Sequence, residues 1–281
     1  MRAWADGRLL NRADEAVLPV TDHGVTVGDG VFESVKVVDG RPFALDLHLD
    51  RLVRSAAGLG LIEPSRSDVL TGVRAVLAEE HLPLGRLRIT LTGGPAPLGS
   101  GRGDSPGTLM VVAAPMAPLS ASTSVVTVSW TRNENSATAG LKTTSYADNV
   151  IALAEAARRG ASEAIFANTR GELCEGTGSN VFYVVDGELR TPSLASGCLA
   201  GVTRALVLEW VEAVEVDEPL EVAAGAEEVF LVSTTRDVQA VTRWNERELA
   251  APGPVTRAAA AVWRERAPEL FKGVEDSAAP M

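Results

Sequence analysis

The spacing of apolar residues along the chain predicts alternating strands and helices. Residues 31–38 form a strand-like run, and the Asp39-Gly40 pair that follows has the composition of a hairpin turn. Residues 47–57 instead place apolar side chains three and four positions apart and are followed by glycines, which predicts a helix. By the same criteria we expect further helices at 68–80, 148–159 and 201–210, and further strands at 87–91, 108–113, 124–130, 163–167, 180–185 and 228–233.

Strands and helices alternate through the whole chain, an order that predicts mixed α and β layers. At 281 residues the chain is long for a single hydrophobic core, so we expect two domains. The alanine- and proline-rich stretch at 114–118 has the composition of a linker. We therefore expect an N-terminal α/β domain at 1–114 and a C-terminal domain at 115–281.

A loop at 93–107, rich in glycine, proline and serine, joins two of the predicted strands. It is longer than a hairpin needs, and loops of this length without regular structure are usually functional or disordered. We expect it to act as a lid rather than as a connection within a core.

The composition argues against several classes of function. The chain has 26 basic and 37 acidic residues and a formal net charge of −11, which disfavours nucleic acid or an anionic membrane as the main partner. Cys174 and Cys198 do not make a disulfide framework, and no Cys/His spacing resembles a zinc site, so no metal is predicted. The first residues contain no apolar leader, and no apolar run approaches the ~20 residues that span a bilayer, so we expect a cytoplasmic protein.

Lysine is rare in this chain, and one lysine has an unusual setting. Only 3 lysines accompany 23 arginines, and Lys142 lies within Gly-Leu-Lys-Thr-Thr-Ser-Tyr. An ε-amine can become neutral and nucleophilic, whereas a guanidinium stays charged. Lys142 is therefore a candidate for covalent chemistry. The alternative is that the scarcity reflects genome composition and that Lys142 is an ordinary loop lysine.

Two segments have the features of a phosphate site. Gly201-Val202-Thr203-Arg204 begins a predicted helix, whose first N–H groups and partial positive charge attract anions. Ser233-Thr234-Thr235 directly follows a predicted strand and offers hydroxyl and amide groups for the same phosphate. Each has a simpler interpretation: Thr203 could cap its helix, and the second segment could form an ordinary turn.

Glu175 precedes a small, flexible turn, Gly-Thr-Gly-Ser at 176–179, that leads into an apolar strand beginning at Asn180. A carboxylate at such a strand end needs a cationic partner, and a protonated pyridine nitrogen would serve. The alternative is an exposed glutamate in a surface turn. A reactive lysine, a phosphate site and an acidic residue together match the requirements of pyridoxal 5′-phosphate.

The same segments resemble those of a known family. The chain is similar over nearly its full length to the class IV (fold type IV) pyridoxal-phosphate enzymes, which include branched-chain aminotransferases, D-amino acid aminotransferases and 4-amino-4-deoxychorismate lyases. The motifs that carry the resemblance are Asp-Gly-Val-Phe-Glu at 29–33, His-Leu-Asp-Arg-Leu at 48–52, Leu-Lys-Thr at 141–143, Glu-Gly-Thr-Gly-Ser-Asn-Val-Phe at 175–182, Ala-Gly-Val-Thr-Arg at 200–204 and Ser-Thr-Thr at 233–235.

Carried over position by position, the resemblance implies a D-amino acid aminotransferase-like fold: a smaller N-terminal domain, a larger C-terminal domain, the cofactor between them, and a homodimer. Lys142 would bind the cofactor as a Schiff base, and Glu175 would pair with the pyridine nitrogen. The remaining cofactor contacts would come from Arg51, Ser179, Asn180, Val202, Thr203, Ser233 and Thr234. For Arg51 the alternative is a solvated charge beside Asp50 and Arg54.

The resemblance implies an aminotransferase that moves an amino group between an amino acid or amine and an α-keto acid. Two alternatives stay open: a 4-amino-4-deoxychorismate lyase that releases pyruvate and p-aminobenzoate, and a non-catalytic binding protein of the same fold. Substrate choice is expected to depend on Phe32, Ser34 and Lys36, which share one strand face, and on Arg102 in the 93–107 loop. The arginine and histidine that bind the substrate carboxylate in D-amino acid aminotransferases align near Leu98 and Ser100 here, which disfavours that specificity.

Overall fold

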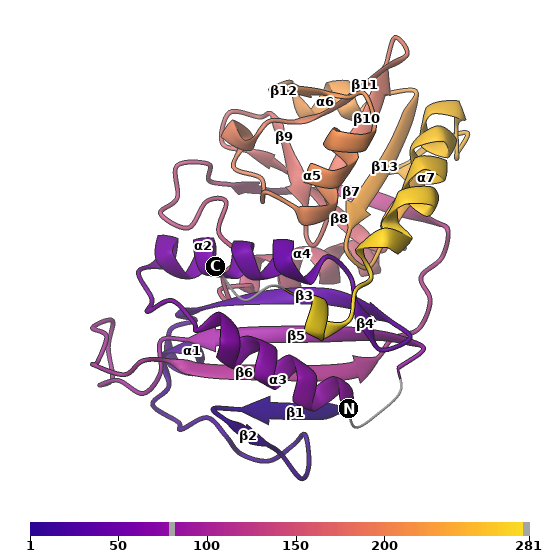
Figure 1. Cartoon of the computed structure of the whole chain (residues 1–281). Helices are drawn as coiled ribbons and strands as arrows, with labels where there is room; N and C mark the ends of the chain where they lie inside the picture. The colour runs from indigo at the N-terminus through magenta and orange to yellow at the C-terminus, as the bar shows by residue number, and fades with distance from the viewer. Residues whose placement is uncertain (79–81, 278–281) are drawn as a thin grey trace. The chain divides into compact units, whose positions relative to one another are not determined.

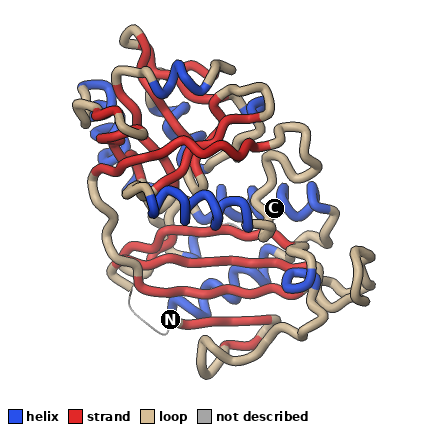
Figure 2. The backbone as a smooth tube through the Cα atoms, turned by 180° about the vertical axis from the view of Figure 1, so that it is seen from behind, coloured by secondary structure: helices blue, strands red, loops and turns tan. Residues whose placement is uncertain are grey.

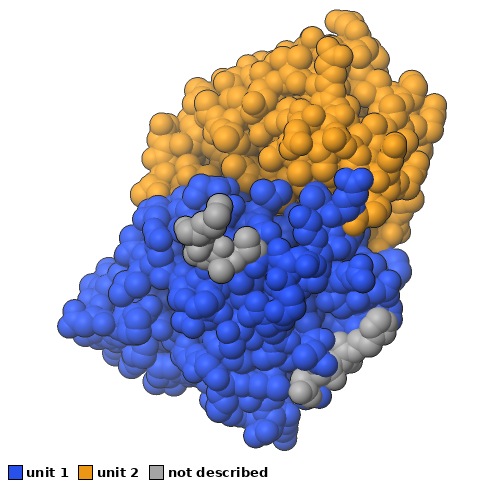
Figure 3. All heavy atoms as spheres, in the orientation of Figure 1, with its two compact units in different colours: residues 1–118, 141–146, 269–281 blue, residues 119–140, 147–268 orange. Residues whose placement is uncertain are grey.

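A computed structural model of the protein describes residues 1–78 and 82–277. The chain forms two compact units, shown in different colours in Figure 3. The first unit comprises residues 1–118, 141–146 and 269–281, and the second comprises residues 119–140 and 147–268. No helix in the described parts of the chain is long and apolar enough to cross a membrane.

The first unit is built on a six-stranded sheet with the strand order β2-β1-β6-β5-β3-β4 (Figures 1 and 2). Each pair of neighbouring strands in it is antiparallel. Its strands are β1 (Arg2–Ala5), β2 (Arg8–Leu9), β3 (Gly30–Val38), β4 (Arg41–Pro42), β5 (Leu84–Thr92) and β6 (Thr108–Pro115), and its helices are α1 (His23–Thr26), α2 (Leu45–Leu59) and α3 (Arg66–Ala78).

One face of this sheet forms the core with α2 and α3. Apolar residues at alternate positions of β3, β5 and β6 pack there against the apolar stripes of the two helices. The Asp39-Gly40 pair does turn the chain from β3 into β4, with φ angles of 48° and 74°. Helix α2 ends at Gly60, whose φ of 73° is the left-handed conformation that favours glycine at this position.

The second unit is built on a nine-stranded sheet with the order β12-β11-β10-β13-β14-β7-β8-β9, in which β15 also pairs with β14. Helix α4 covers β7 and β8, and the rings of Trp210 on α5 and Trp263 on α7 lie 5.3 Å apart. The strands are β7 (Ser122–Arg132), β8 (Glu163–Asn168), β9 (Leu173–Gly176), β10 (Asn180–Val185), β11 (Glu188–Pro192), β12 (Val214–Val216), β13 (Glu228–Ser233), β14 (Asp237–Trp244) and β15 (Arg247–Glu248). The helices are α4 (Ala147–Arg158), α5 (Val202–Trp210), α6 (Leu220–Ala224) and α7 (Pro254–Arg266), with short 3₁₀ turns at Leu194–Ser196, Ala267–Leu270 and Val274–Asp276.

The structure divides the chain differently from the boundary expected at 114/115. That position falls inside β6, and residues 141–146 and 269–281 return to the first unit. These returns depend on backbone hydrogen bonds between distant segments, such as Ala44 N to the carbonyl of Leu270 at 2.8 Å. Local composition contains no signal for such contacts. As a result, Lys142 belongs to the first unit and not to the C-terminal domain in which it was expected.

Most predicted elements are present within a few residues of their expected ends, but several others were not predicted. The end expected for the second helix, residue 80, lies outside the described residues. Strand β9 was not predicted and includes Gly176, the first residue of the 176–179 stretch that was interpreted as a turn; it forms because it pairs with β8. Helix α7 was missed since its sequence, Pro-Val-Thr-Arg-Ala-Ala-Ala-Ala-Val-Trp-Arg-Glu-Arg, has few large apolar residues to mark a face.

Candidate cofactor and substrate site

The segment that contains Lys142 lies along the edge of β3. Phe32 N donates a hydrogen bond to the carbonyl of Lys142 at 3.0 Å, and Thr144 N donates to the carbonyl of Gly30 at 2.8 Å. The backbone N–H of Lys142 itself donates to the hydroxyl of Ser55 on α2 at 3.2 Å. These bonds hold the backbone on both sides of Lys142, so its side chain projects from an anchored position.

The side chain of Lys142 contacts the ring of Phe32. Its Nζ lies 4.5 Å from the ring centroid, and the guanidinium carbon of Arg88 lies 3.6 Å from the same centroid. The ring of Tyr146 meets Phe32 edge to face, with centroids 5.4 Å apart. Lys142 thus contacts an aromatic ring that a second cation and a tyrosine ring also contact, which is a more specific environment than that of an ordinary loop lysine.

Arg51 is not a solvated charge. It is buried on α2, and its Nε and Nη2 donate to the two carboxylate oxygens of Glu33, each at 2.7 Å. Glu33 Oε2 also accepts a hydrogen bond from Nδ1 of His48 at 2.7 Å. Although burial alone would raise the pKa of Glu33, the charges and hydrogen bonds of Arg51 and His48 lower it to about 2. Burial lowers the pKa of His48, and the positive charges of Arg51 and Lys142 lower it further against the opposing effect of Glu33.

Phe32, Ser34 and Lys36 share one face of β3, as predicted. The residues that alternate with them along the strand belong to the opposite face, which packs against α2. Phe32 is buried, while Ser34 and Lys36 are half-buried. Ser34 lies directly opposite Arg88 of β5 in the sheet register. This face therefore combines an apolar wall, a small residue and two cations; its role in substrate binding stays a prediction.

Arg102 has partners within its own unit. Its guanidinium makes two hydrogen bonds with the carboxylate of Asp29, at 2.7 and 2.6 Å, and donates to the carbonyls of Leu59 and Gly60 at 2.7 and 2.8 Å. A bidentate pair of this kind is among the stronger hydrogen-bonded contacts. Binding a substrate carboxylate would require Arg102 to leave Asp29; its role in substrate binding stays a prediction. The cleft beside it, of about 380 Å³, is lined by His23, Val27, Gly28, Asp29, Leu59, Ser100, Arg102 and Ser145.

The N-terminus of α5 in the second unit has the features of an anion site. Gly201 is the N-cap and makes no side-chain capping bond, so the capping interpretation of Thr203 is wrong. The hydroxyl of Thr203 is buried, and no hydrogen-bond partner for it is found among the described residues. A buried polar atom normally has a partner. Its position in the first turn of a helix therefore fits a bound phosphate oxygen.

Glu175 is on a strand and is not an exposed turn residue. Its side chain is 15% exposed, and its Oε2 accepts a hydrogen bond from Leu199 N at 2.9 Å. Its Oε1 lies 3.4 Å from Nε of Arg132, close enough for an ion pair but without the geometry of a hydrogen bond. The cation that the sequence required beside this carboxylate is thus present within the protein as Arg132, whose guanidinium carbon also lies 4.1 Å from the centroid of the Phe166 ring.

Glu163 of β8 connects two of the segments that were predicted to bind the cofactor. This buried carboxylate accepts hydrogen bonds from Thr177 N at 2.9 Å and from Ser179 Oγ at 3.0 Å, and also from the hydroxyl of Thr177. On the other side, Nη2 of Arg236 donates to it at 3.2 Å, and Arg236 N donates to the hydroxyl of Ser233 at 3.2 Å. One carboxylate therefore holds the 177–179 turn and the residues after β13.

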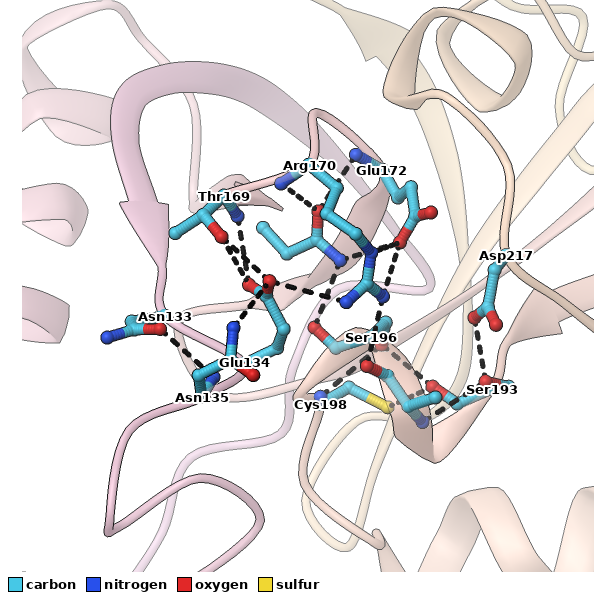
Figure 4. Close-up of polar contacts among 12 residues, drawn as sticks. Asn133, Glu134, Asn135, Thr169, Arg170, Glu172, Ser193, Ser196, Cys198 and Asp217 are labelled. Carbon is cyan, nitrogen blue, oxygen red and sulfur yellow. Dashed lines mark hydrogen bonds and ion pairs between the residues drawn. The ribbon is translucent and has the colours of Figure 1, made fainter.

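The loop that leads toward Lys142 is anchored in the second unit (Figure 4). Thr169 donates to the carboxylate of Glu134 from its hydroxyl at 2.7 Å and from its backbone N–H at 3.0 Å, and the hydroxyl bond is the main cause that lowers the pKa of Glu134. Arg170 lies 3.3 Å from Glu134 and donates to the carbonyl of Ala195 at 3.1 Å. The network thus links the start of the 133–140 loop to the turn that precedes Cys198.

Three residues beside the predicted ones were missed: Arg88, Arg132 and Glu163. Arg88 and Glu163 are charged residues within predicted strands, and a charge at such a position is a signal that could have been used. Arg132 follows the expected end of its strand, and nothing in its neighbours marks it. Of the other predicted cofactor residues in the second unit, Ser233 is half-buried, and the buried ones are Ser179, Asn180, Val202 and Thr234. The Asn180 side chain donates to the carbonyl of Leu199 at 2.9 Å.

Comparison with known proteins agrees with these features. The family model for amino-transferase class IV matches residues 30–244. A D-alanine aminotransferase of Bacillus licheniformis is 30% identical over 277 residues, covering 92% of this chain and 94% of its own. An aminodeoxychorismate lyase of Bacillus subtilis is 29% identical over 256 residues, covering 86% of each chain. The crystal structure of a branched-chain aminotransferase from Thermoproteus uzoniensis with norvaline superimposes with a TM-score of 0.86, at 29% identity and 94% coverage of each chain.

The fold and the cofactor predicted from the sequence are confirmed at the level of the family. The two-sheet α/β fold matches that of fold type IV aminotransferases. Enzymes of this family use pyridoxal 5′-phosphate, and similar solved structures include a pyridoxal-phosphate-bound form. The matched region spans most of the chain and contains Lys142, Glu175 and the N-terminus of α5. The chain therefore belongs to the class IV aminotransferase family.

Proposed function

We propose that the protein is a pyridoxal-phosphate-dependent aminotransferase that moves an amino group between an α-amino acid and an α-keto acid. The observation that carries the proposal is the position of Lys142, which is anchored at the edge of β3 with its Nζ 4.5 Å from the centroid of the Phe32 ring. This ring and Ser34 offer a wall and a small gap beside the amine. Such a surface suits a small substrate better than a large dianionic ring.

The residues of the second unit fit the cofactor. The backbone N–H groups of Val202 and Thr203, with the unpartnered Thr203 hydroxyl, would hold the phosphate. Ser233 ends β13 and Thr234 follows it, and both would add contacts to the same group. In the first unit, Arg51 would contribute its positive charge while Glu33 keeps its guanidinium in a fixed orientation.

Each catalytic group has a defined task. The amine of Lys142 would hold the cofactor covalently between turnovers, and during turnover it would take the proton from the substrate α-carbon and return a proton. The carboxylate of Glu175 would keep a proton on the pyridine nitrogen. When bound, the cofactor supplies an electron sink for the pair left at the α-carbon. Arg132 and Leu199 N orient Glu175 for this task.

The second candidate function is that of a 4-amino-4-deoxychorismate lyase. It is favoured by the similarity to the Bacillus subtilis lyase, whose identity of 29% is close to the 30% of the D-alanine aminotransferase. The two reactions share the cofactor and the lysine, so these residues do not separate them. A non-catalytic role is disfavoured, because the chain retains Lys142, Glu175 and the glycine-led start of α5.

The test is a half-reaction assay. Purified holoenzyme is mixed with L- and D-amino acids, and the absorbance is followed for conversion to the pyridoxamine form, which an α-keto acid should reverse. We expect at least one amino acid to convert the enzyme in this way. If none does, and aminodeoxychorismate yields pyruvate and p-aminobenzoate, the lyase function replaces the proposed one. The homodimeric state and a cytoplasmic location are part of the proposal and need their own measurements.

A further inference from the structure

Glu163 is a buried carboxylate at the start of β8, and its hydrogen bonds reach two turns of the second unit. Its Oε1 accepts from the backbone N–H of Thr177 at 2.9 Å and from the hydroxyl of the same residue. Its Oε2 accepts from the Ser179 hydroxyl at 3.0 Å and from Nη2 of Arg236 at 3.2 Å. The side chain of Glu163 is only 2% exposed. A charge buried this deeply is unfavourable unless it is paired and hydrogen-bonded, and both oxygens of Glu163 meet that condition.

The two turns lie side by side at one end of the second-unit sheet. The first, at 177–179, leads into β10, and the second, at 234–236, leads from β13 into β14. Asn180 at the start of β10 stands opposite Val232 near the end of β13, so the two turns extend from neighbouring strand ends. The second turn contains Thr234, for which we proposed a contact with the cofactor phosphate.

Arg236 fastens the second turn to its surroundings. Its backbone N–H donates to the hydroxyl of Ser233 at 3.2 Å. Its guanidinium donates to the carbonyl of Ser162 at 3.3 Å and to the side chain of Gln239. These partners are neutral, and Glu163 supplies the negative charge that the guanidinium pairs with at 3.2 Å. The orientation of the turn therefore depends on an ion pair that is largely shielded from water, where such a pair is strongest.

The hydroxyl of Ser179 is committed to the same carboxylate. A serine hydroxyl has one proton to donate, and in Ser179 that proton goes to Glu163. Phosphate oxygens accept hydrogen bonds, so a hydroxyl that binds a phosphate has to donate to it. The hydroxyl is also closely packed, since a Cβ on Gly176 would lie 2.4 Å from its oxygen. Ser179 is thus poorly placed to serve both Glu163 and a cofactor phosphate.

We propose that Glu163 is a positioning residue for the cofactor. Through Arg236 it fixes the turn that carries Thr234, and the Ser179 hydroxyl acts by orienting Glu163 instead of contacting the cofactor. This role rests on the cofactor contacts of the function proposed above. Because the oxygens of Glu163 are already bonded to protein groups, it acts on cofactor affinity and not on proton transfer.

The first test is the affinity for pyridoxal phosphate, measured by dialysing the holoenzyme against graded cofactor concentrations and reading the absorbance of the bound form. In Glu163→Gln the amide oxygen stays with the two donors of Thr177, and the NH₂ group faces Nη2 of Arg236, so a donor meets a donor. We expect the dissociation constant to rise about tenfold, the loss of one well-oriented hydrogen bond to a charged group.

A second variant breaks the same ion pair from its less buried side. Arg236→Met leaves Glu163 its bonds to the 177–179 turn and changes a half-buried residue, so it gives the same information if Glu163→Gln does not fold. Its dissociation constant should rise by a similar factor. The double variant should show no more than the larger single effect, because both changes remove one interaction. Unchanged affinity in the single variants, or effects that add in the double variant, overturns the proposal.

Glu228→Gln is the matched control. Glu228 is another buried carboxylate of this unit, at the start of β13, and it accepts hydrogen bonds from Val255 N at 3.1 Å and Thr256 N at 2.8 Å, in the first turn of α7. Its replacement should lower the free energy of unfolding in urea and leave the dissociation constant of the cofactor unchanged. An equal loss of cofactor affinity in Glu163→Gln and Glu228→Gln would show that Glu163 only stabilises the fold.

The second test separates the two possible roles of Ser179. Ser179→Ala should raise the dissociation constant about threefold in the wild-type background and have no further effect beside Glu163→Gln. A loss of the same size in both backgrounds would mean that the hydroxyl binds the cofactor directly, against the proposal. These measurements need no amino-acid substrate. If the half-reaction assay fails, the proposed aminotransferase function fails with it, and the dialysis experiments still decide the role of Glu163.

Discussion

Glu33 pairs with two buried polar side chains of α2. It is fully buried, and its two carboxylate oxygens are bonded to Arg51 and His48. Removing one partner from such a buried pair leaves an uncompensated charge, a loss of about 3–5 kcal/mol. We infer that Glu33 acts by orienting Arg51, and that its own stabilising contribution is present above its ordinary pKa of 4.5 and is lost as the pH falls toward about 2.

His48 predicts a measurable pH dependence of stability. Its pKa in the folded protein is below the ordinary value of 6.5, mainly because of burial, so the unfolded chain binds a proton that the folded chain excludes. The contribution of His48 to the free energy of unfolding is fully present above pH 6.5 and decreases as the pH falls. His48→Gln keeps a donor for Glu33 without titrating. In urea unfolding at about pH 7.5 and about pH 5.5, the wild type should lose stability relative to the variant on acidification. A relative gain would mean that His48 is charged in the fold.

We expect replacement of Glu175 to slow the reaction without releasing the cofactor. Glu175→Gln should keep the cofactor bound, because the proposed phosphate contacts at α5 would be unchanged. The half-reaction should slow at least about tenfold, because a neutral amide does not hold a proton on the pyridine nitrogen and a charge-assisted hydrogen bond is worth roughly 1.5–3 kcal/mol. Stopped-flow absorbance measures the rate. Unchanged single-turnover kinetics would remove Glu175 from the site.

At the scale of secondary-structure elements, the start of α5 is held in place by close packing with the beginning of β10. A Cβ on Gly201 would lie 2.0 Å from Oδ1 of Asn180, whose amide nitrogen donates to the carbonyl of Leu199. This approach leaves room only for glycine. The N–H groups of α5 are therefore positioned by a contact between a glycine and an asparagine side chain.

Gly201→Ala should displace Asn180 or the first turn of α5 and raise the dissociation constant of the cofactor at least about tenfold, equivalent to about 1.4 kcal/mol. Fluorescence titration of the apoenzyme with pyridoxal phosphate measures the change. Gly101→Ala is the control, since a Cβ there meets no atom within 4 Å. Equal cofactor affinity in both variants would show that the α5 terminus does not bind the phosphate.

The elements that carry the candidate site were largely predictable, because their apolar patterns lie within short stretches of sequence. Strand β3 and helices α2 and α5 have apolar periods that one short window reveals. The unpredicted parts depend on partners far along the chain: β9 forms because β8 is beside it, and residues 142–144 pair with the edge of β3. The charge balance of Arg102 depends in the same way on which acids the fold brings near, and no local pattern contains that information.

At the scale of the whole molecule, we predict a homodimer. The 93–107 loop is long and polar for a core connection, and Val20, Val25 and Leu98 of the first unit are exposed apolar residues at 86%, 60% and 83%. Sedimentation equilibrium of the holoenzyme should give twice the chain mass of 29.4 kDa. We expect this loop to reach the active site of the partner subunit, so a fully active monomer would contradict both the dimer and this expectation.

Borohydride reduction of the yellow holoenzyme, followed by peptide mapping, tests the central claim that Lys142 carries the cofactor. Reduction makes the covalent link permanent, and because the chain has only three lysines, Lys36, Lys142 and Lys272, the labelled peptide is unambiguous. The account predicts a phosphopyridoxyl group on Lys142 and none in Lys142→Ala. A label on Lys36 or Lys272, or a trappable cofactor that persists in the variant, would contradict it.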